Sequence, residues 1–367
     1  MSIRKNKFSE HSFFMTLAQD QAKRVIGNTK KNPAVGCVII KNNCVVGAGS
    51  TGFNGKPHAE HTALNFPKIN TNNAELYTTL EPCSHYGETP PCTKLIIKKN
   101  VKKVFYSIND PDERSYNKCK NILKSKGIKV KNGLNKSKNN IFYRSYFKFK
   151  KKDLPFVTCK IAVSKDFYTI NKKKKWITNK YSRGRVHLIR SKHDCIITSS
   201  KTIIDDNPKL TCRILGLETG SPARIILDSK LKTPINSQVV RDANKIETII
   251  FYNKINNDKI RILKKKNVLV FRIPLNKEGN LDLQESLIKA KKLGFSRILL
   301  ESGINLMINF FASNLIDDFK LFISNTKINK NGDGNIKKYL KIILKNKIKD
   351  HKNVNLFNEK LISYRIK

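Results

Sequence analysis

Apolar residues in the first half of the chain alternate between helical and strand spacing. Residues 9–25 carry apolar side chains three and four positions apart, which predicts an amphipathic helix ending near Gly27. Apolar runs at 35–40 and 44–48 flank Lys41-Asn42-Asn43, a sequence typical of a tight hairpin turn. Further strands are predicted at 76–80, 101–107 and 128–130, with helices starting near His58, following Pro91 and ending before Gly127. Strands that alternate with helices indicate an α/β layer structure.

A charged stretch separates this pattern from a second one. Residues 148–152 are mostly lysine and are followed by Asp153-Leu154-Pro155, so we interpret them as a linker. We therefore expect two domains, residues 1–149 and 155–367. The second domain has predicted strands at 156–163, 195–198, 224–228, 248–252, 268–271, 297–301 and 319–323, and predicted helices at 284–293 and 304–315. A second α/β domain is the simplest interpretation.

Composition changes this picture in one respect, the charge. The 367 residues are enough for about two domains, and a 39% apolar content excludes a disordered chain. The 73 basic residues against 28 acidic ones give a net charge of +45, which suits a nucleic-acid or anionic-membrane partner. The lysines, however, are spread along the whole chain among Asn and Ile, with no aromatic residues repeating between them. We therefore expect no dedicated nucleic-acid surface, but an attraction for phosphorylated small molecules.

Cysteine use and hydropathy indicate a cytoplasmic protein. The eight cysteines are scattered through a large chain, unlike the disulfide framework of a small secreted domain. No run of 18 apolar residues is present, and the short apolar run near the N-terminus is bounded by charged residues. We expect no membrane partner.

Two segments concentrate the candidate chemistry. One is Pro57-His58-Ala59-Glu60, and the other runs from Glu81-Pro82-Cys83 to Pro90-Pro91-Cys92. One imidazole and two thiolates suit a tetrahedral zinc ion and leave the fourth position for water. The sequence therefore predicts one zinc ion per chain, held by His58, Cys83 and Cys92.

Glu60 has a separate predicted role. A carboxylate two residues from a metal-binding histidine lies beside the metal without binding it, where it can take a proton from water and pass it to the departing amine. We therefore predict that Glu60 is the proton shuttle of a deaminase. His85, in the loop between the cysteines, is an alternative ligand, but we place it near the substrate.

The second half gives a weaker signal. No G-x-G-x-x-G follows a strand, so a Rossmann nucleotide site is not supported. Arg190 and Arg213 are candidates for binding a phosphate through charge-assisted hydrogen bonds. Glu301-Ser302-Gly303 ends a strand and opens a helix, where backbone N–H groups can meet another phosphate. Solvated arginines and an ordinary strand–helix turn explain these residues equally well.

Several motifs resemble a known family. Pro-His-Ala-Glu followed by Pro-Cys resembles the cytidine-deaminase-like superfamily, and the eight residues between Cys83 and Cys92 resemble those of the bifunctional riboflavin-biosynthesis deaminase–reductases. Asn32-Pro33-Ala34-Val35-Gly36 and Asn109-Asp110-Pro111 are similar to the same family. The resemblance implies a cytidine-deaminase-like three-layer domain followed by a dihydrofolate-reductase-like α/β domain.

The resemblance also implies an activity and residue roles. The first domain would deaminate 2,5-diamino-6-(5-phosphoribosylamino)pyrimidin-4-one, with Asn32 holding the pyrimidine. The second would use NADPH to reduce the ribosyl chain of the uracil product to ribityl. By this resemblance Lys160, Asp206 and Glu301 lie at the reacting ribose, and Arg190, Leu210 and Arg213 hold the phosphate. The residues expected to contact NADPH are Ala162, Trp176, Thr202, Asp206, Ser229 and Gly303.

Departures from the family pattern leave alternatives open. Phe167 stands where the family has a turn glycine, and the loop before Trp176 is shortened to Lys172–Lys175. A deaminase with a degenerate reductase domain is therefore one alternative. A tRNA or nucleotide deaminase with a basic accessory domain is another, and a non-enzymatic RNA-binding protein is a third. The oligomeric state is left open, a homo-oligomer included.

Overall fold

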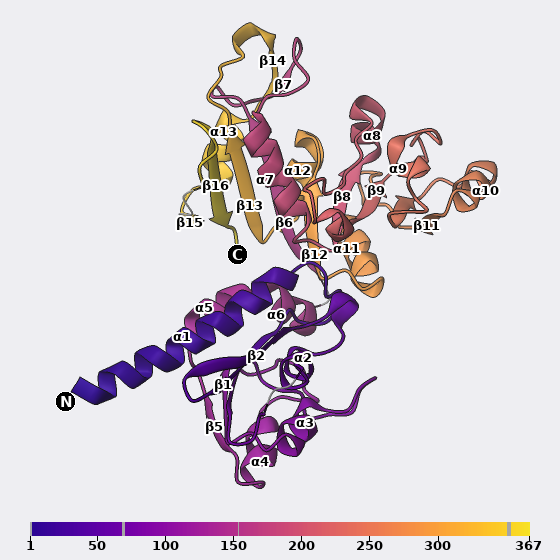
Figure 1. Ribbon diagram of the computed structural model, residues 1–367. Coiled ribbons are helices and arrows are strands. Elements are labelled where there is room, and N and C mark those ends of the chain that lie inside the picture. Colours follow the sequence, from indigo (N-terminus) through magenta and orange to yellow (C-terminus); the bar gives the residue numbers. More distant parts are fainter. Residues whose placement is uncertain (1, 68–69, 153, 351–353) are drawn as a thin grey trace. The chain divides into compact units, whose positions relative to one another are not determined.

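The computed structural model describes residues 2–67, 70–152, 154–350 and 354–367 (Figure 1). The chain divides into two compact units, Met1–Asp153 and Leu154–Lys367. None of the described helices combines the length and the apolar character needed to cross a membrane.

The first unit is built on a five-stranded sheet in the order β2-β1-β3-β4-β5. Strand β1 is antiparallel to β2 and β3, whereas β3, β4 and β5 run parallel. The strands are β1 (Gly36–Lys41), β2 (Cys44–Ser50), β3 (Glu75–Leu80), β4 (Lys103–Ile108) and β5 (Lys129–Asn132). The helices are α1 (Ser2–Val25), α2 (Ala59–Leu64), α3 (Cys92–Lys98), α4 (Cys119–Lys124), α5 (Lys136–Phe142) and α6 (Arg144–Lys151).

Side chains of this sheet point alternately into two cores, which produces three layers. Val38 and Ile40 of β1 pack with Met15 and Ala18 of α1. Their neighbour Ile39 packs on the other face, where α2, α3 and α4 contribute to the second core. Because successive strand residues face opposite sides, a strand buried on both faces is a continuous apolar run.

Two glycines set the distance between these layers. A Cβ atom on Gly36 would lie 1.9 Å from the carbonyl oxygen of Ala18 in α1, and one on Gly49 would lie 2.5 Å from that of Ala59 in α2. Neither position has room for a side chain, so helix backbones rest directly on the sheet. The hairpin between β1 and β2 is also as expected, since Asn42 and Asn43 adopt φ values of 51° and 62°.

The linker predicted at residues 148–152 is wrong, because most of it is helical. Helix α6 continues to Lys151, and its buried Tyr146 packs in the core of the first unit. Lys150 donates to Asp112 at 2.8 Å, and its ammonium group lies 5.8 Å from the ring centroid of Tyr146. The lysines therefore occupy the polar side of an amphipathic helix whose aromatic residues the prediction overlooked.

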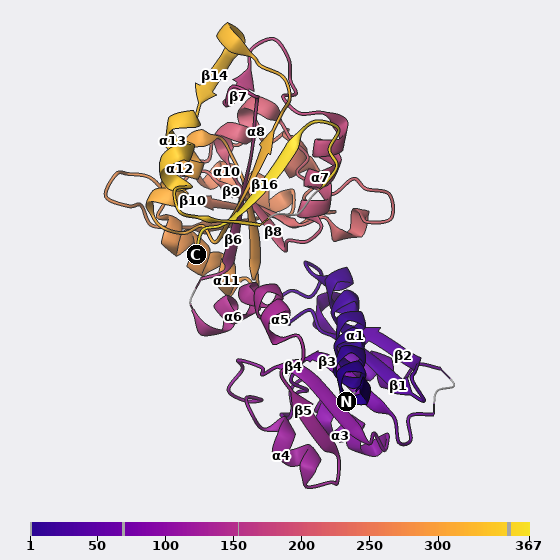
Figure 2. The ribbon, with the colours of Figure 1, turned by 90° about the vertical axis from the view of Figure 1, so that its left-hand side faces the viewer.

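The second unit is built on a nine-stranded sheet in the order β11-β10-β9-β8-β12-β6-β13-β16-β15. The strands from β11 to β13 run parallel, and β16 and β15 add an antiparallel edge that the sequence did not predict. The strands are β6 (Phe156–Val163), β8 (Cys195–Ser199), β9 (Ala223–Leu227), β10 (Thr248–Tyr252), β11 (Val268–Arg272), β12 (Arg297–Glu301), β13 (Asp318–Ile323), β15 (Ile348–Asp350) and β16 (Lys360–Arg365). A separate pair, β7 (Tyr168–Asn171) and β14 (Gly332–Asn335), projects beyond this sheet (Figure 2).

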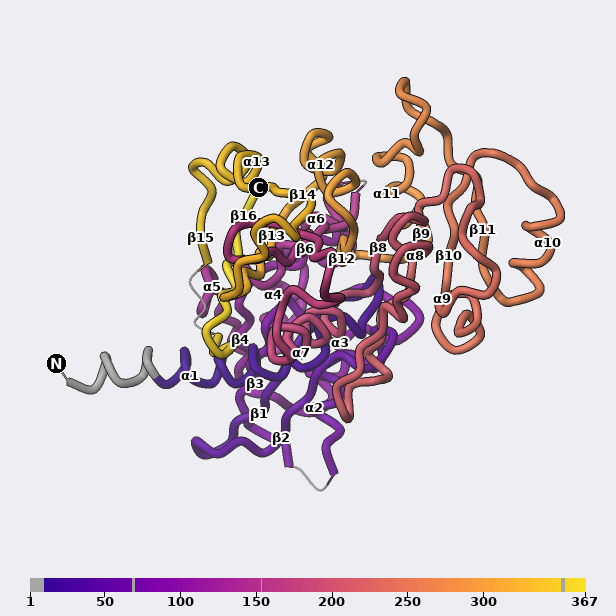
Figure 3. Tube along the Cα trace, turned by 90° about the horizontal axis from the view of Figure 1, so that it is seen from above, coloured from indigo at the N-terminus to yellow at the C-terminus, as the bar shows by residue number. Residues whose placement is uncertain are grey.

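Helices cover both faces of this sheet (Figure 3). Helices α11 (Leu283–Lys292), α12 (Ile304–Ala312) and α13 (Lys337–Ile343) enclose one core. Helices α7 (Lys180–Arg190), α8 (Ser200–Asp206), α9 (Gln238–Arg241) and α10 (Asn257–Lys265) enclose the other. A parallel sheet buried on both faces in this way places the carboxyl ends of its strands at one edge.

The turn that joins β6 to β7 contains the aromatic departure from the family pattern. Phe167 adopts φ 69°, a left-handed conformation that a side chain makes unfavourable. The turn is nevertheless closed, because the Phe167 amide donates to the Ser164 carbonyl at 3.0 Å. The Asp166 carboxylate also accepts from the amides of Ile328 and Asn329, which ties the turn to a distant segment.

A buried cation holds the centre of the second unit together. Arg224 on β9 is fully buried, and its guanidinium donates to the carbonyls of Lys209, Val239 and Ile246 and to the Thr248 hydroxyl. Burial lowers the pKa of Arg224 to about 10, so the group still carries its charge at neutral pH. The distributed carbonyl dipoles compensate that charge.

We expect Arg224→Met to destabilise the second unit by about 3 kcal/mol, because three buried carbonyls lose a charged donor. Urea unfolding followed by the fluorescence of Trp176, the one tryptophan of the chain, measures this unit. Arg241→Met, at an exposed arginine of α9, is the matched control and should leave the midpoint unchanged. Equal midpoints for the two variants would contradict the role of Arg224.

Candidate active sites

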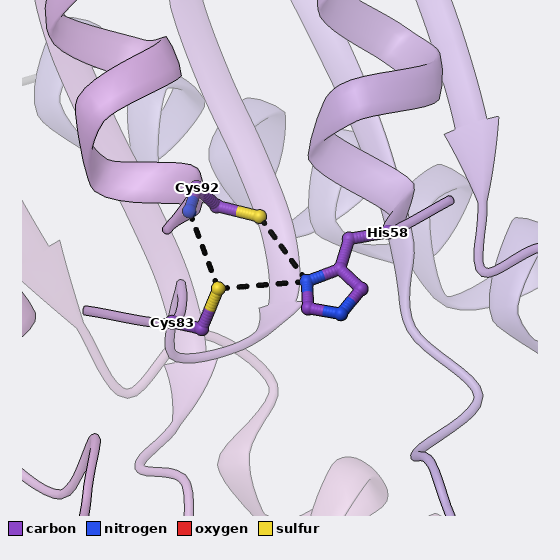
Figure 4. Close-up of side chains that lie close together, drawn as sticks. All are labelled: His58, Cys83 and Cys92. Atoms are coloured by element: carbon purple, nitrogen blue, oxygen red, sulfur yellow. Dashed lines mark hydrogen bonds between the residues drawn. The ribbon is translucent and has the colours of Figure 1, made fainter. Parts of the chain in front are cut away.

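The three predicted metal ligands meet at the start of two helices (Figure 4). His58 immediately precedes α2, and Cys92 is the first residue of α3. Cys83 follows the end of β3 by three residues. One ligand atom from each lies within 4.8 Å of the other two, and this trio is the one group of this kind among the described residues.

The distances fit a zinc ion. The Nδ1 atom of His58 lies 3.5 Å from the Cys83 sulfur and 3.4 Å from the Cys92 sulfur. Zinc–nitrogen and zinc–sulfur bonds of ordinary length at a tetrahedral angle separate such atoms by about 3.6 Å. Nδ1 is therefore the imidazole atom placed to bind the metal.

The thiols of Cys83 and Cys92 differ in how readily they ionise. Hydrogen bonds from Cys92 and His58 lower the pKa of Cys83 to about 4, despite its burial. The Cys92 amide also donates to the Cys83 sulfur at 3.2 Å. The bond to Cys83, together with burial, raises the pKa of Cys92. A divalent cation in this position would replace the shared proton and allow both sulfurs to ionise.

Glu60 lies beside the trio and is buried. Its Oε1 accepts from the Thr78 hydroxyl at 3.0 Å, and its Oε2 lies 3.4 Å from the Cys92 sulfur. Burial raises the pKa of Glu60. A carboxyl group held next to a metal position with a raised pKa has the properties of a proton carrier.

The surrounding loops are held by groups that the sequence analysis did not single out. The buried Glu81 carboxylate accepts from the amides of Asp110, Asn117 and Cys119, which joins the end of β3 to the segment 110–119. His85 is not part of the metal trio, since its Nδ1 is 2.8 Å from the Ser115 hydroxyl on that segment. Thr78 and Thr79 are polar residues in a strand that is buried from Leu76 to Leu80, which is the one local signal for them. No local pattern connects Thr78 to Glu60 or Glu81 to its distant amides.

Asn32 lies next to the loop that leads into His58. Its side-chain amide donates to the Gly55 carbonyl at 3.4 Å. Gly55 has φ 95°, and a Cβ atom there would lie 2.0 Å from the Asn32 amide nitrogen, so the contact requires glycine. Asn32 is thus fixed against the segment 52–57.

In the second unit, one cavity of about 1450 Å³ is lined by every site residue that the sequence analysis predicted for this domain. Segments far apart in the sequence supply the lining, because the carboxyl ends of neighbouring parallel strands open at the same edge. The predicted residues that line it are Lys160, Ala162, Trp176, Arg190, Thr202, Asp206, Leu210, Arg213, Ser229, Glu301 and Gly303.

A buried ion pair is part of the lining of this cavity. Arg190 donates from Nε and Nη2 to the two oxygens of Glu301 at 2.7 and 2.8 Å. Burial alone would raise the pKa of Glu301, but the charge and bonds of Arg190 outweigh it and set that pKa at about 2. Lys160 on β6 is paired in register with Glu301 on β12, and burial lowers its pKa. Glu301 thus remains ionised between two cationic groups.

Asp206 and Trp176 are exposed, as are Arg213 and Gly303 of the same set. Asp206 ends α8, and burial and the neighbouring Asp205 raise the pKa of its carboxyl group. The guanidinium of Arg183 lies 5.0 Å from the Trp176 ring centroid, which holds the indole at the cavity wall. Gly303 precedes the first residue of α12, as the strand–helix turn predicted.

Comparisons with known proteins match both domains. Residues 155–360 match a family model described as the RibD C-terminal domain, and residues 8–108 match the cytidine and deoxycytidylate deaminase zinc-binding region. A relative from Aquifex aeolicus (strain VF5), named riboflavin biosynthesis protein RibD, is 34% identical over 313 residues. That similarity covers 85% of this chain and 86% of the relative.

Solved structures extend the similarity to the whole fold. The RibD structure from Acinetobacter baumannii has a TM-score of 0.84 and 26% identity, covering 98% of this chain and 99% of that one. A deaminase/reductase structure from Thermotoga maritima has a TM-score of 0.83 with the same identity and coverage. The predicted cytidine-deaminase-like and reductase folds are thereby confirmed. The chain belongs to the RibD family of bifunctional riboflavin-biosynthesis enzymes, in which a zinc-binding deaminase domain is joined to an NADPH-dependent reductase domain.

Proposed function

We propose that the two domains act in succession on one phosphoribosylated pyrimidine in the cytoplasm. The first, residues 1–149, deaminates 2,5-diamino-6-(5-phosphoribosylamino)pyrimidin-4-one, and the second, residues 155–367, reduces the ribosyl group of the uracil product. The Thermotoga maritima relative is named for these two substrates. The convergence of His58, Cys83 and Cys92 beside the buried Glu60 is the observation that carries the proposal.

In the deaminase, His58 Nδ1 and the thiolates of Cys83 and Cys92 would hold the zinc ion. A zinc ion bound there supplies an acidified water as nucleophile. Glu60 would take up one proton from the attacking water and deliver it to the pyrimidine ring nitrogen, and then carry the second proton of that water to the amino group, which departs as ammonia. The Thr78 hydroxyl orients Glu60 during this transfer, and Asn32 holds the pyrimidine.

In the reductase, the residues lining the cavity bind the nucleotide and the phosphoribosyl group of the substrate. NADPH, when bound, supplies the hydride that converts the opened ribosyl chain to ribityl. Lys160, Asp206 and Glu301 position the ribose and handle its protons, while Arg190, Leu210 and Arg213 hold its phosphate. Ala162, Trp176, Thr202, Asp206, Ser229 and the turn at Gly303 contact the nucleotide. Support for these roles comes from the shared cavity.

The first prediction concerns the metal. The purified protein should contain one zinc ion per chain, and Cys92→Ser should lose it, because a serine hydroxyl does not ionise to replace a thiolate. Elemental analysis measures the content, with Cys44→Ser, at an exposed cysteine, as the control. Full zinc occupancy in Cys92→Ser would remove Cys92 from the ligand set.

A second prediction separates the proton carrier from the metal. Glu60→Gln keeps the shape and the zinc but removes the acid–base group, so deamination should fall by about a hundredfold or more. Ammonia release measures the rate, and zinc content checks the site. Glu113→Gln, at an exposed glutamate, should behave as the unmodified protein. Near-normal turnover of Glu60→Gln would assign proton transfer to another residue.

A third prediction tests the reductase against the alternative of a degenerate domain. The complete polar lining indicates real NADPH oxidation with the deaminated intermediate, and Lys160→Met should abolish it while ammonia release continues. Lys165→Met, at the exposed lysine of the neighbouring turn, is the control. Absent NADPH consumption in the unmodified protein, with normal deamination, would favour a deaminase carrying an inactive second domain.

A further inference from the structure

His187 lines the reductase cavity and has no role in the function proposed above. Its Nδ1 lies 2.9 Å from the Thr211 carbonyl oxygen. A carbonyl oxygen only accepts and a backbone amide only donates, so Nδ1 cannot bond to both Thr211 and Arg213. The contact with the carbonyl is the shorter one, which assigns the hydrogen to Nδ1. The same assignment excludes Nδ1 as the acceptor for the Arg213 amide, which is 3.3 Å away.

This bond fixes the chemistry of the other ring nitrogen. With the hydrogen on Nδ1, the neutral ring has its lone pair on Nε2, which is therefore where a second proton binds. No hydrogen-bond partner for Nε2 is found among the described residues. Since the ring lines the cavity, Nε2 is the polar atom that His187 can offer to a ligand.

The charged side chains around His187 carry a net positive charge. Arg190 also donates from Nη1 to the Thr211 carbonyl, at 3.0 Å, and its bonds to Glu301 use one N–H each of Nε and Nη2, so two of its five N–H groups remain for a ligand. Arg213 donates from Nη1 to the Thr211 hydroxyl at 3.2 Å and has no carboxylate partner among the described residues. Thr211 therefore gathers Arg190, Arg213 and His187 around one point, where Glu301 bonds to Arg190 and the charge of Arg213 is left without a bonded carboxylate among the described residues.

We propose that His187 is a third ligand for the substrate phosphate, beside Arg190 and Arg213, and that it binds this phosphate in its protonated form. The proposal rests on the assignment of this cavity to a phosphorylated substrate. A protonated Nε2 donates a charge-assisted hydrogen bond to a phosphate oxygen, whereas neutral Nε2 would set a lone pair against it.

The direction of the pH dependence follows from the surroundings. Burial, then Arg190 and Arg213, lowers the pKa of His187, while the Thr211 carbonyl and Glu301 oppose that shift. The other cations lining this cavity are Lys160 on β6, Lys175, Arg183 on α7, Lys201 and Lys209. A bound dianion reverses the balance and raises the pKa, so binding takes up a proton. Affinity is therefore greatest at low pH and declines as the pH rises through the pKa of the liganded form.

Sulfate is a suitable probe, because it keeps both charges from about pH 6 to 9, whereas a phosphate ester changes charge near pH 6. Its affinity for the full chain, loaded with zinc and NADPH, is measured by calorimetry and by inhibition of NADPH oxidation. We expect the affinity of the unmodified protein to fall by up to about tenfold per pH unit, with as much as one proton taken up on binding.

Two variants separate the histidine from the arginines. His187→Gln retains a neutral side chain of similar reach, and its sulfate affinity should be independent of pH. Arg213→Gln should weaken sulfate binding at every pH and keep the pH dependence. If His187 only supported the structure, His187→Gln would keep the pH dependence of sulfate affinity and the proton uptake on binding.

The outcomes distinguish this proposal from the function on which it rests. Sulfate binding that depends on Arg213 but shows no pH slope, or the same slope in His187→Gln, would overturn the role of His187 alone. Absence of sulfate binding, with Arg213→Gln leaving the KM for the deaminated intermediate unchanged, would instead contradict the phosphate site itself.

Discussion

Burying a charge is costly unless directed hydrogen bonds surround it, and both sites depend on meeting that requirement. In the first unit, Glu60 is held by Thr78, and Glu81 is held by three backbone amides that also fix the loop behind the metal site. In the second, Glu301 is held by Arg190 from the facing helix. Glu81 and Glu301 lie at the ends of β3 and β12, and Glu60 of α2 bonds to Thr78 within β3, so the sheets determine where the chemistry takes place.

The residues that carry chemistry were predictable where their spacing was local. His58 with Glu60, and Cys83 with Cys92, occur in short segments whose order and residue types indicate a zinc site, and the structure brings the trio together. The hairpin at Asn42 and Asn43 was equally local. Thr78 and Glu81 were not predictable, because their partners come from separate segments whose approach depends on the complete sheet.

The sequence analysis missed two elements whose sequences are rich in polar residues. In α6 the lysines concealed the aromatic residues that pack the helix into the core of the first unit. Strand β16 (Lys360–Arg365) is short and partly polar, but it pairs along its whole length with β13, where the hydrogen-bonding edge of an existing sheet compensates for a weak intrinsic preference. The reductase cavity could not be predicted from local sequence either, because its lining residues extend from Lys160 to Gly334.

Phe167 carries a consequence for the stiffness of the reductase domain. A left-handed φ costs a residue with a side chain roughly 1–2 kcal/mol. The ring packs against the core of this unit, and a phenylalanine loses less backbone freedom on folding than a glycine does. These gains oppose the strain, so the turn resists reorganisation more than a glycine turn would. The arm of β7 and β14, whose strands line the cavity with Thr169, Ile170, Asp333 and Gly334, is thereby joined to β6 through a rigid connection.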